Sequence, residues 1–332
     1  MRKRLAALVV LACAGPALAQ DPPACTGKNL LDELRVKDPA KYEAVMAESR
    51  TVPNGEAVLW KIERDGLPVS YLLGTAHVTD PRVTKGPPGV EDLIAGSRKV
   101  ALEVKELADD QEMAMAVMRS APLMVMPVGK TLWDVVPDAD EAAVRKSPNL
   151  PAGGADAIYG YKPWVVATML TLPPCEQARE ASGMKSFDEL IARFANRKGV
   201  EVVGLETLAE QFAVLSGMDM DLQVRYLVET ARMSDRAADN LETLLALYDR
   251  RQLTALMPLM MALEEPSETT KAVYAYVESD LIRKRNRLMA KRAGDLLAKG
   301  NVFIAVGALH LPGDEGLVEL IRKAGYKVTA VN

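Results

Sequence analysis

Short runs of apolar residues near position 60 predict a β-hairpin. Residues 58–63 read VLWKIE and residues 69–73 read VSYLL, with a polar Arg-Asp-Gly turn at 64–66 between them. Alternating or continuous apolar runs of this length are typical of strands, and a glycine-containing polar turn is typical of a hairpin. Two antiparallel strands are therefore expected at the start of the folded region.

Two strand-helix-strand patterns lie at opposite ends of the chain. Parallel strands require a crossover connection of this kind, so each pattern predicts a β-α-β unit. We expect both units to contribute to one central mixed sheet of an α/β fold, to which a short strand at 201–203 also belongs. The first unit comprises 69–73, a helix near 90–97 and a strand at 99–102; the second comprises a strand at 302–306, a helix at 316–324 and a strand at 326–331.

The sequence between these units is dominated by helical periodicity. Apolar residues recur at helical spacing in several stretches, separated by proline and glycine. The sheet is therefore expected to be interrupted by large helical insertions. The predicted helices are 107–120, 139–146, 160–171, 187–197, 219–233, 235–249 and 267–298.

The first 19 residues have the pattern of a secretory signal peptide. Three cations at positions 2–4 precede an apolar run from Leu5 to Ala19 that ends in Ala-Leu-Ala. This run is shorter than the roughly 20 residues that cross a bilayer, and no later run approaches that length. We expect cleavage after Ala19 and export across the inner membrane into the periplasm, without a transmembrane anchor in the mature chain.

Two cysteines, Cys25 and Cys175, remain after the predicted cleavage. They are not in a zinc-type spacing. In an oxidising compartment they could form a disulfide, and two unpaired thiols are the alternative. The formal charge of -4 becomes -7 when the three cations of residues 1–19 are removed. An acidic chain without a basic stripe lacks the electrostatic signature of a nucleic-acid-binding protein.

The two histidines of the chain occupy matching positions. His77 follows Gly74 by three residues, His310 follows Gly307 by three residues, and each motif begins where an apolar strand ends. Open α/β sheets bind ligands at the carboxyl ends of their strands, because the departing loops open a crevice there. A lone histidine in such a place is often structural, but two in the same context favour a function. We therefore expect both Gly-x-x-His motifs to meet in one site.

Carboxylates also follow two apolar strands. Glu103 comes directly after residues 100–102, and Glu206 comes after residues 202–205. Acidic residues seldom lie beside such apolar stretches without a partner. Two histidines with one or two carboxylates can bind a divalent first-row metal, or can activate water without a metal. Both chemistries stay open, and an exposed charge at a strand end is the alternative role for either glutamate.

Motifs of other enzyme classes are absent from the sequence. The chain contains no His-Glu-x-x-His, no Gly-x-Ser-x-Gly, no phosphate-binding loop and no Gly-x-Gly-x-x-Gly. The sequence therefore provides no support for a zincin, an α/β-hydrolase, a nucleotide-binding protein or a Rossmann dehydrogenase.

Taken together, these motifs resemble the TraB/GumN family, which is related to the Tiki metalloproteases and more distantly to erythromycin-esterase and ChaN-like proteins. The resemblance covers about residues 55–332, so we expect a TraB/GumN-like domain there, with a helical insertion at about 107–298, after an N-terminal segment at 20–54. The segments that carry it are YLLGTAH at 71–77, the strand ending at Glu103, Lys162-Pro163-Trp164, Gly204-Leu205-Glu206-Thr207 with Gln211, Arg285-Asn286 with Met289, and VGALHLPG at 306–313 with Gly316-Leu317.

The resemblance implies a metal-dependent hydrolase that cleaves a peptide or polypeptide and uses a divalent metal, manganese or cobalt. It assigns metal binding and catalysis to His77, Glu103 and His310, with Glu206 as a further catalytic residue. Arg285 and Asn286 match a family position where a cation could hold a substrate carboxylate or an oxyanion, so we expect them to bind substrate. A charged helix face is the alternative for these two.

Two other functions fit the same sequence. One keeps the site without a metal and uses a histidine as general base on an ester or lactone. The other is a protein without catalytic activity, whose helical insertions bind a periplasmic partner. The sequence does not separate these functions from a metal-dependent peptidase.

Overall fold

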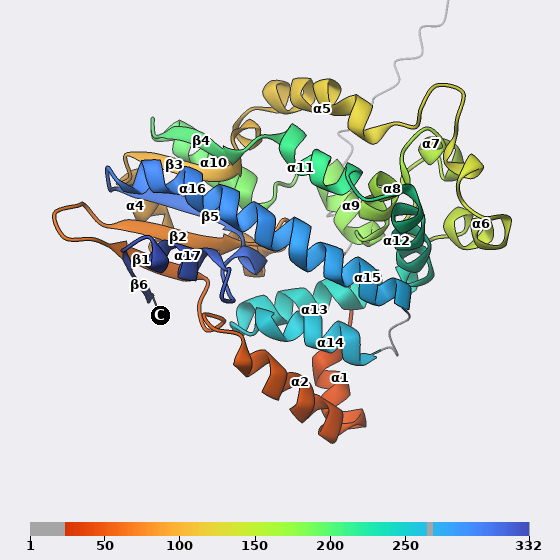
Figure 1. Cartoon of the computed structure of the whole chain (residues 1–332), viewed down its shortest axis with the longest axis horizontal. Helices are drawn as coiled ribbons and strands as arrows, with labels where there is room; N and C mark the ends of the chain where they lie inside the picture. The colour runs from red at the N-terminus through yellow and green to blue at the C-terminus, as the bar shows by residue number, and fades with distance from the viewer. Residues whose placement is uncertain (1–23, 264–267, 332) are drawn as a thin grey trace, which may run out of the picture.

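A six-stranded mixed sheet underlies the fold and lies on the left of the view in Figure 1. The structure is a computed structural model that describes residues 24–263 and 268–331, so the predicted signal peptide lies outside the described residues. The strand order is β4-β3-β5-β2-β1-β6. Strands β2, β3, β4 and β5 are mutually parallel, whereas β1 is antiparallel to β2 and β6. The strands are β1 (Leu59–Glu63), β2 (Ser70–Thr75), β3 (Lys99–Val104), β4 (Glu201–Glu206), β5 (Val302–Gly307) and β6 (Lys327–Ala330).

The predicted hairpin and both β-α-β units are present. Strands β1 and β2 pair with Trp60 opposite Leu72. The two units share one sheet, as expected, but neither consists of neighbouring strands. Strand β5 lies between β2 and β3, and strands β2 and β1 lie between β5 and β6. The first crossover contains α3 (Pro81–Thr84) and α4 (Val90–Ala95), and the second contains α17 (Leu317–Lys323).

Both faces of the sheet are covered by helices. Leu72 packs in a cluster with Met289 and Leu317, from α16 (Arg285–Leu297) and α17. Its neighbour Leu73 points to the opposite face and packs in a cluster with Ile94 of α4 and Ile191 of α10 (Phe187–Arg197). Burial on both faces explains why these strands are continuous apolar runs, because no position of a central strand faces water.

Helices occupy most of the chain between β3 and β5. Each helix predicted there has a counterpart, and the helix predicted at 267–298 corresponds to α15 (Glu268–Tyr276), the π-helical segment η5 (Val277–Lys284) and α16 in succession. A third cluster of buried apolar side chains lies among α6, α8 and α12, away from the sheet. The other helices of this region are α5 (Asp110–Met124), α6 (Asp138–Arg145), α7 (Ala155–Ile158), α8 (Pro163–Leu170), α9 (Pro174–Ala181), α11 (Leu208–Ser216), α12 (Met220–Arg232), α13 (Ala237–Asp249) and α14 (Leu256–Leu263).

The segment before the sheet also folds. It forms α1 (Leu30–Lys37) and α2 (Pro39–Thr51), which pack against α13 and α14 below the sheet (Figure 1). Cys25 is bonded to Cys175 at the start of α9. The disulfide therefore ties the N-terminal segment to the helical insertion and excludes two free thiols.

Among the described residues, no helix is long and apolar enough to cross a membrane.

Removing the disulfide should destabilise the protein. Closing a loop with a sequence separation of 150 residues restricts the unfolded chain, so Cys25→Ser should lower the free energy of unfolding by about 2–4 kcal/mol. Cys175→Ser and the double variant should lose the same amount, because all three lack one bond. Urea denaturation followed by circular dichroism measures this, and a double variant with twice the loss of either single variant would contradict the assignment.

Candidate active site

The ends of β2 and β5 bring the two Gly-x-x-His motifs together. In these adjacent parallel strands, Gly74 pairs with Val306 and Thr75 pairs with Gly307. A Cβ atom on Gly74 would lie 2.8 Å from the Cβ of Ala308, closer than real side chains approach. Glycine is therefore needed at position 74 because the exit of one strand packs against the exit of the other. His77 and His310 consequently lie at one edge of the sheet, as expected.

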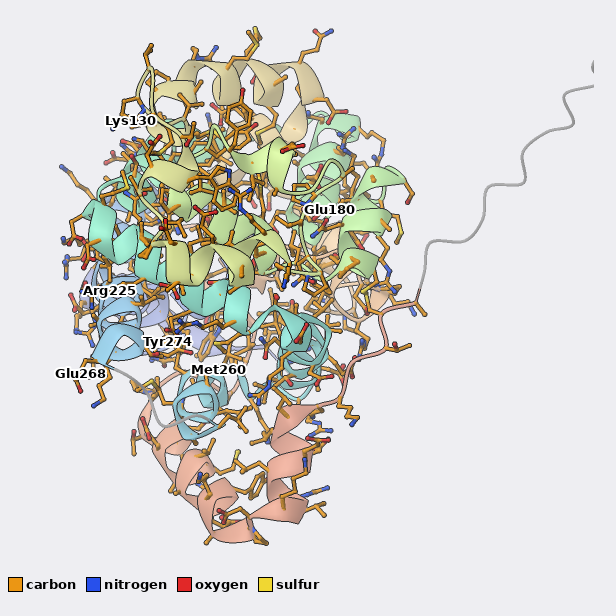
Figure 2. All side chains as sticks on the ribbon, turned by 90° about the vertical axis from the view of Figure 1, so that its right-hand side faces the viewer. Lys130, Glu180, Arg225, Met260, Glu268 and Tyr274 are labelled. Atoms are coloured by element: carbon orange, nitrogen blue, oxygen red, sulfur yellow. A yellow bond between two sulfur atoms is a disulfide. The ribbon has the colours of Figure 1, made fainter. Side chains whose placement is uncertain are left out.

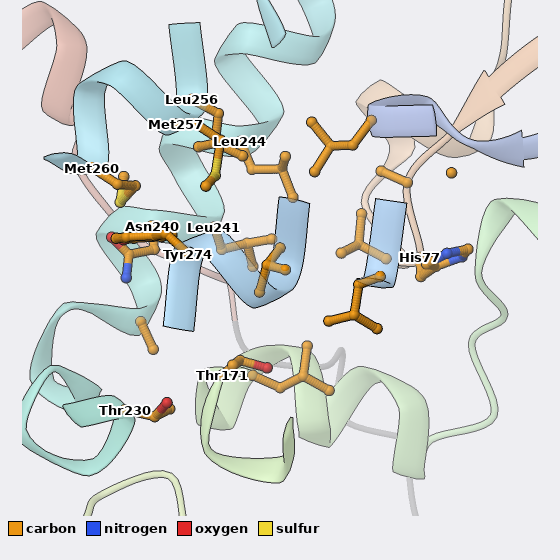
Figure 3. A pocket seen from close by; sticks show the side chains of 18 of the residues that line it. His77, Thr171, Thr230, Asn240, Leu241, Leu244, Leu256, Met257, Met260 and Tyr274 are labelled. Carbon is orange, nitrogen blue, oxygen red and sulfur yellow. The ribbon is translucent and has the colours of Figure 1, made fainter. Parts of the chain in front are cut away.

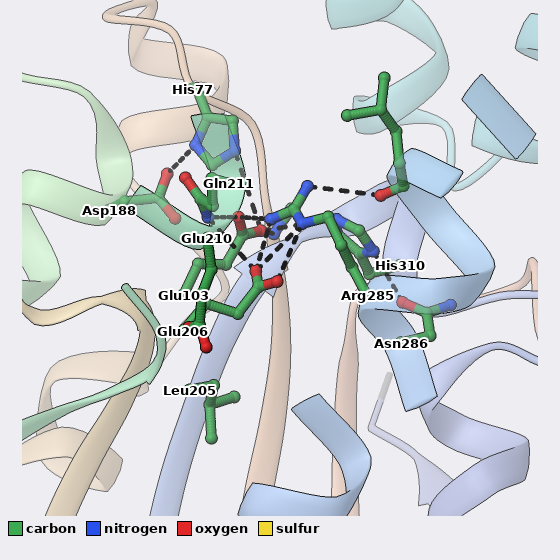
Figure 4. Close-up of polar contacts among 12 residues, drawn as sticks. His77, Glu103, Asp188, Leu205, Glu206, Glu210, Gln211, Arg285, Asn286 and His310 are labelled. Atoms are coloured by element: carbon green, nitrogen blue, oxygen red, sulfur yellow. Dashed lines mark hydrogen bonds and ion pairs between the residues drawn. The ribbon is translucent and has the colours of Figure 1, made fainter. Parts of the chain in front are cut away.

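The carboxylate of Glu103, at the end of β3, lies between the two histidines (Figure 4). Its Oε1 is 3.9 Å from His77 Nε2 and 3.8 Å from His310 Nε2, and it accepts a hydrogen bond of 2.7 Å from the Gly307 amide. A Cβ on Gly307 would lie 3.3 Å from Oε1 and 3.4 Å from His77 Nε2. The second glycine thus leaves space at the point where the three side chains converge.

Asp188 orients His77. Its Oδ2 lies 2.9 Å from His77 Nδ1, and its Oδ1 accepts a hydrogen bond of 2.6 Å from the Thr75 hydroxyl. The Asp188 side chain is 2% exposed and the His77 side chain 59%. Asp188 lies in the first turn of α10, which Ser186 and Glu189 begin with a capping box. The negative charge of Asp188 is the main reason that the pKa of His77 is raised.

Asn286 orients His310 and determines its tautomer. The Asn286 amide donates a hydrogen bond of 2.8 Å to the carbonyl of Glu315, so its oxygen faces His310 Nδ1, at 2.7 Å. An amide oxygen only accepts, so Nδ1 of His310 carries the proton and Nε2 has a free lone pair. Burial lowers the pKa of His310 to about 4, which keeps the ring neutral at neutral pH.

Arg285 joins two buried carboxylates. Its Nη2 lies 2.7 Å from Glu103 Oε2 and 2.8 Å from Glu206 Oε2, and its Nε donates to the same carboxylate of Glu206. The three side chains are 11%, 7% and 1% exposed, in the order Arg285, Glu103, Glu206. Burial raises the pKa of Glu103, but the charges of His310 and His77 in their protonated forms, the charge of Arg285 and the Gly307 amide outweigh it and lower that pKa to about 2.

The structure therefore places all six predicted site residues in one cluster, in two layers. His77, His310 and Glu103 face one another, whereas Glu206 contacts Arg285 and the side-chain amide of Gln211. In the structure, Arg285 contacts Glu103 and Glu206. Asn286 contacts His310 and the carbonyl of Glu315. Catalysis by Glu206 and substrate binding by Arg285 and Asn286 stay predictions.

Two residues of the cluster were not predicted as site residues. Gln211 of α11 donates hydrogen bonds to Glu103 Oε2 at 2.9 Å and to Glu206 Oε2 at 3.4 Å. Asp188 comes from an amphipathic helix in the insertion, where an acidic residue in the first turn is ordinary. For Gln211, the signal in the sequence is its place beside Gly204-Leu205-Glu206-Thr207 in the family resemblance; for Asp188, it is the capping motif at 186–189.

Another buried carboxylate holds the loop that follows His77. Glu176, on α9, accepts hydrogen bonds from the amide of Thr79 at 2.5 Å and from its hydroxyl at 3.1 Å. Glu176 is fully buried and is adjacent to Cys175, which is bonded to Cys25. The disulfide therefore anchors the helix that carries Glu176, and Glu176 in turn holds the loop after His77.

The chemistry of the donors fits a divalent first-row metal. Nε2 of His77, Nε2 of His310 and Oε1 of Glu103 converge, and the Nδ1 atoms are held by a carboxylate and an amide oxygen, as is usual for metal-binding histidines. Ligands of one ion lie about 3 Å apart, because each metal–ligand bond is about 2.0–2.2 Å long. Among the described residues, no group of three His, Cys, Asp or Glu is close enough to hold an ion as it stands. Each histidine Nε2 would have to move closer to Glu103 Oε1 by less than about 1 Å.

The fold and site together define an α/β protein with histidines and a carboxylate at the carboxyl edge of a central sheet. The chain belongs to the TraB/PrgY/gumN family, whose family model matches residues 58–330. This confirms the family resemblance seen in the sequence.

Curated relatives carry the name metalloprotease. The chain is 26% identical to Metalloprotease TIKI1 of Danio rerio, over 81% of this chain and 62% of the relative. It is 23% identical to Metalloprotease TIKI1 of Homo sapiens, over 81% of this chain and 61% of the relative. The chain thus spans about three fifths of the length of these relatives. No solved structure matches the chain significantly.

Replacing Arg285 should destabilise the cluster strongly. Arg285→Leu leaves Glu103 and Glu206 buried beside each other without their shared cation, which should cost about 3–5 kcal/mol of the free energy of unfolding. Arg283→Leu is the matched control, because Arg283 is 49% exposed and its ion pairs are on the surface. It should change the free energy by less than about 1 kcal/mol. Equal losses in urea denaturation would show that the buried pairs contribute no more than surface ones.

Proposed function

We propose that this protein is a metal-dependent hydrolase that cleaves peptide bonds. The observation that carries the proposal is the convergence of His77 Nε2, His310 Nε2 and Glu103 Oε1 at one edge of the sheet. The metalloprotease names of the relatives support this reaction class and a polypeptide substrate. Manganese or cobalt is the metal we expect.

His77, His310 and Glu103 would hold the ion. A divalent ion bound by these residues supplies Lewis acidity toward the scissile carbonyl and lowers the pKa of water. For this role both imidazoles must present an unprotonated Nε2. The proton of His310 is already fixed on Nδ1 by Asn286. In His77, the Asp188 carboxylate can accept a hydrogen bond from Nδ1–H, which keeps the proton on Nδ1 and makes Nε2 the nitrogen that binds the ion.

The other residues of the cluster control charge and proton position. Arg285 neutralises part of the negative charge of Glu103 and Glu206. Gln211 donates to both carboxylates and limits their rotation. Glu206 is the remaining carboxylate that could take a proton during hydrolysis, after a shift of Arg285. We assign Arg285 and Gln211 to positioning and charge balance, and Glu206 to the role of general base.

We also propose that the protein works outside the cytoplasm, in the periplasm. The first 19 residues have the pattern of a signal peptide. The disulfide between Cys25 and Cys175 supports an oxidising compartment, because cytoplasmic thiols are kept reduced.

One observation favours metal-free hydrolysis as a second candidate. Both oxygens of Glu103 already accept hydrogen bonds, from Gly307, Arg285 and Gln211. A carboxylate so fully engaged has less capacity to bind an ion. In this candidate a histidine acts as general base on an ester or lactone, and hydrolysis is insensitive to chelators.

Replacing either histidine should abolish hydrolysis. His77→Ala and His310→Ala each remove one of three donors, so both should lose the bound metal and at least a hundredfold of peptidase activity. Metal content is measured by inductively coupled plasma mass spectrometry after loading with manganese or cobalt, and activity with a broad peptide library.

The same experiments distinguish the metal-dependent peptidase from the metal-free hydrolase of esters or lactones. Loss of activity on chelation and recovery with manganese or cobalt support the metal-dependent function. Ester hydrolysis that survives chelation, but not His310→Ala, supports the metal-free one. A wild-type protein that binds no metal and hydrolyses neither peptides nor esters would contradict both and favour a binding protein without catalytic activity.

Asp188→Asn should impair the site without unfolding the protein. The amide can present its NH2 group to Nδ1 and so favour the wrong tautomer of His77, which should reduce metal affinity or peptidase activity about 10–100-fold. Asp249→Asn, on the exposed end of α13, is the matched control and should leave both unchanged. Equal activity of the two variants would contradict the orienting role of Asp188.

A further inference from the structure

The site opens into a large chamber within the helical insertion. A pocket of about 650 Å³ begins at His77, Arg285 and His310 and extends between α12, α13, α14 and α15. Figure 3 shows His77 at one end of it and Met260, Asn240 and Tyr274 at the other. Figure 2 shows the same helical side from outside, with Arg225, Met260 and Tyr274 on α12, α14 and α15. The chamber is therefore continuous with the reacting edge of the sheet.

The wall of the chamber is apolar away from the site. Leucine, methionine and valine side chains from four helical segments face the space, and its aromatic side chains are Tyr226 and Tyr274. Among the described residues of the lining, Glu229 is the one carboxylate, and it is paired with Arg232. A wall of this kind stabilises an apolar ligand, since a charged ligand would lose its hydration without gaining partners. Representative apolar residues of the wall are Leu241, Leu244, Leu256, Met257, Met260 and Val273.

The volume of the chamber fits either a peptide segment or a hydrocarbon chain. A cavity of about 150 Å³ holds one benzene-sized group, so this chamber has room for about four apolar side chains. Polar side chains at intervals in the wall favour the peptide (Figure 3): the hydroxyls of Thr171 and Thr230 donate to backbone carbonyls and can still accept a hydrogen bond, and Asn240 offers an amide. Peptide groups need such partners when they leave water, whereas an acyl chain does not.

We propose that this chamber binds an apolar segment of the substrate polypeptide, about three or four residues long, next to the scissile bond. The proposal rests on the hydrolytic function proposed above and names the kind of sequence that the site selects. Methionine contributes to this selection because its flexible side chain adapts to different apolar residues. The charged cluster at Glu103 then lies at one end of the bound segment, and the apolar wall holds the rest.

Binding to fluorescein-labelled peptides tests the proposal in the full-length mature protein. One peptide carries a core of Leu, Met and Val between Gly-Ser flanks, and the other carries Ser, Asn and Gln in the same flanks. Fluorescence polarisation should show at least tenfold tighter binding of the apolar peptide. Met257→Glu should remove that preference, because Met257 faces the chamber. Met118→Glu, the same change at a side chain that is 74% exposed on α5, should keep it.

A second variant tests the chamber if the first one does not fold. If thermal unfolding shows that Met257→Glu is unstable, Thr230→Trp fills the chamber from α12 without adding charge and should also weaken binding at least tenfold. Its control is Thr51→Trp at the exposed end of α2, because both threonines donate a hydrogen bond to the preceding turn.

The outcomes distinguish this proposal from the proposed function. Equal binding of both peptides, or unchanged binding by the chamber variants, would overturn the chamber as a specificity site even if peptides are cleaved. Displacement of the apolar peptide by dodecanoate at similar concentrations would overturn the peptide as occupant and favour an acyl chain. Tight, chamber-dependent binding without cleavage, checked by mass spectrometry, supports the chamber and contradicts the hydrolytic function.

Discussion

The carboxylate of Glu103 is the interaction on which the site depends. It is buried at the end of a central strand, and each of its oxygens accepts at least one hydrogen bond. One oxygen binds a backbone amide and faces both histidines, and the other binds Arg285 and Gln211. A carboxylate without these partners would be expelled to water or protonated, since burial of a lone charge is costly. The strands β2, β3 and β5, the helix α16 and the helix α11 are thus held together by one acidic group.

The sheet and the insertion have different roles around this group. The strands deliver His77, Glu103 and His310 to one edge. The helices supply Asp188, Asn286 and Gln211, which determine where the protons lie and how the side chains are turned. The proposed hydrolysis at neutral pH needs both, because a histidine in the wrong tautomer presents a proton where a lone pair is required. In this proposal the helical insertion orients the site without providing any of the three converging donors.

The sequence was informative where one local pattern determines the outcome. The apolar strands, the paired Gly-x-x-His motifs and Glu103 were all predicted, because strand exits at the carboxyl edge are visible as apolar runs that end in glycine or an acid. Asp188 was missed because its contact with His77 joins residues 111 apart, and nothing near it distinguishes it from a surface acid. Helix α14 was missed for another reason: LMPLMMAL is apolar throughout and contains a proline, so it has no periodicity to detect. The interleaved order of the strands was not predicted either, because it depends on packing across the whole domain.

The position of β5 has a consequence for synthesis of the protein. Strands β2 and β3 do not touch in the sheet, because β5 fills the space between them, and Ser70 bonds to Val302 across 232 residues. A nascent chain therefore has two unsatisfied strand edges until β5, at Val302–Gly307, has been made. Exposed edges of this kind promote aggregation, and contacts between distant residues slow folding. A product that ends before residue 302 would lose not a peripheral element but a strand from the middle of the sheet, and the second histidine with it.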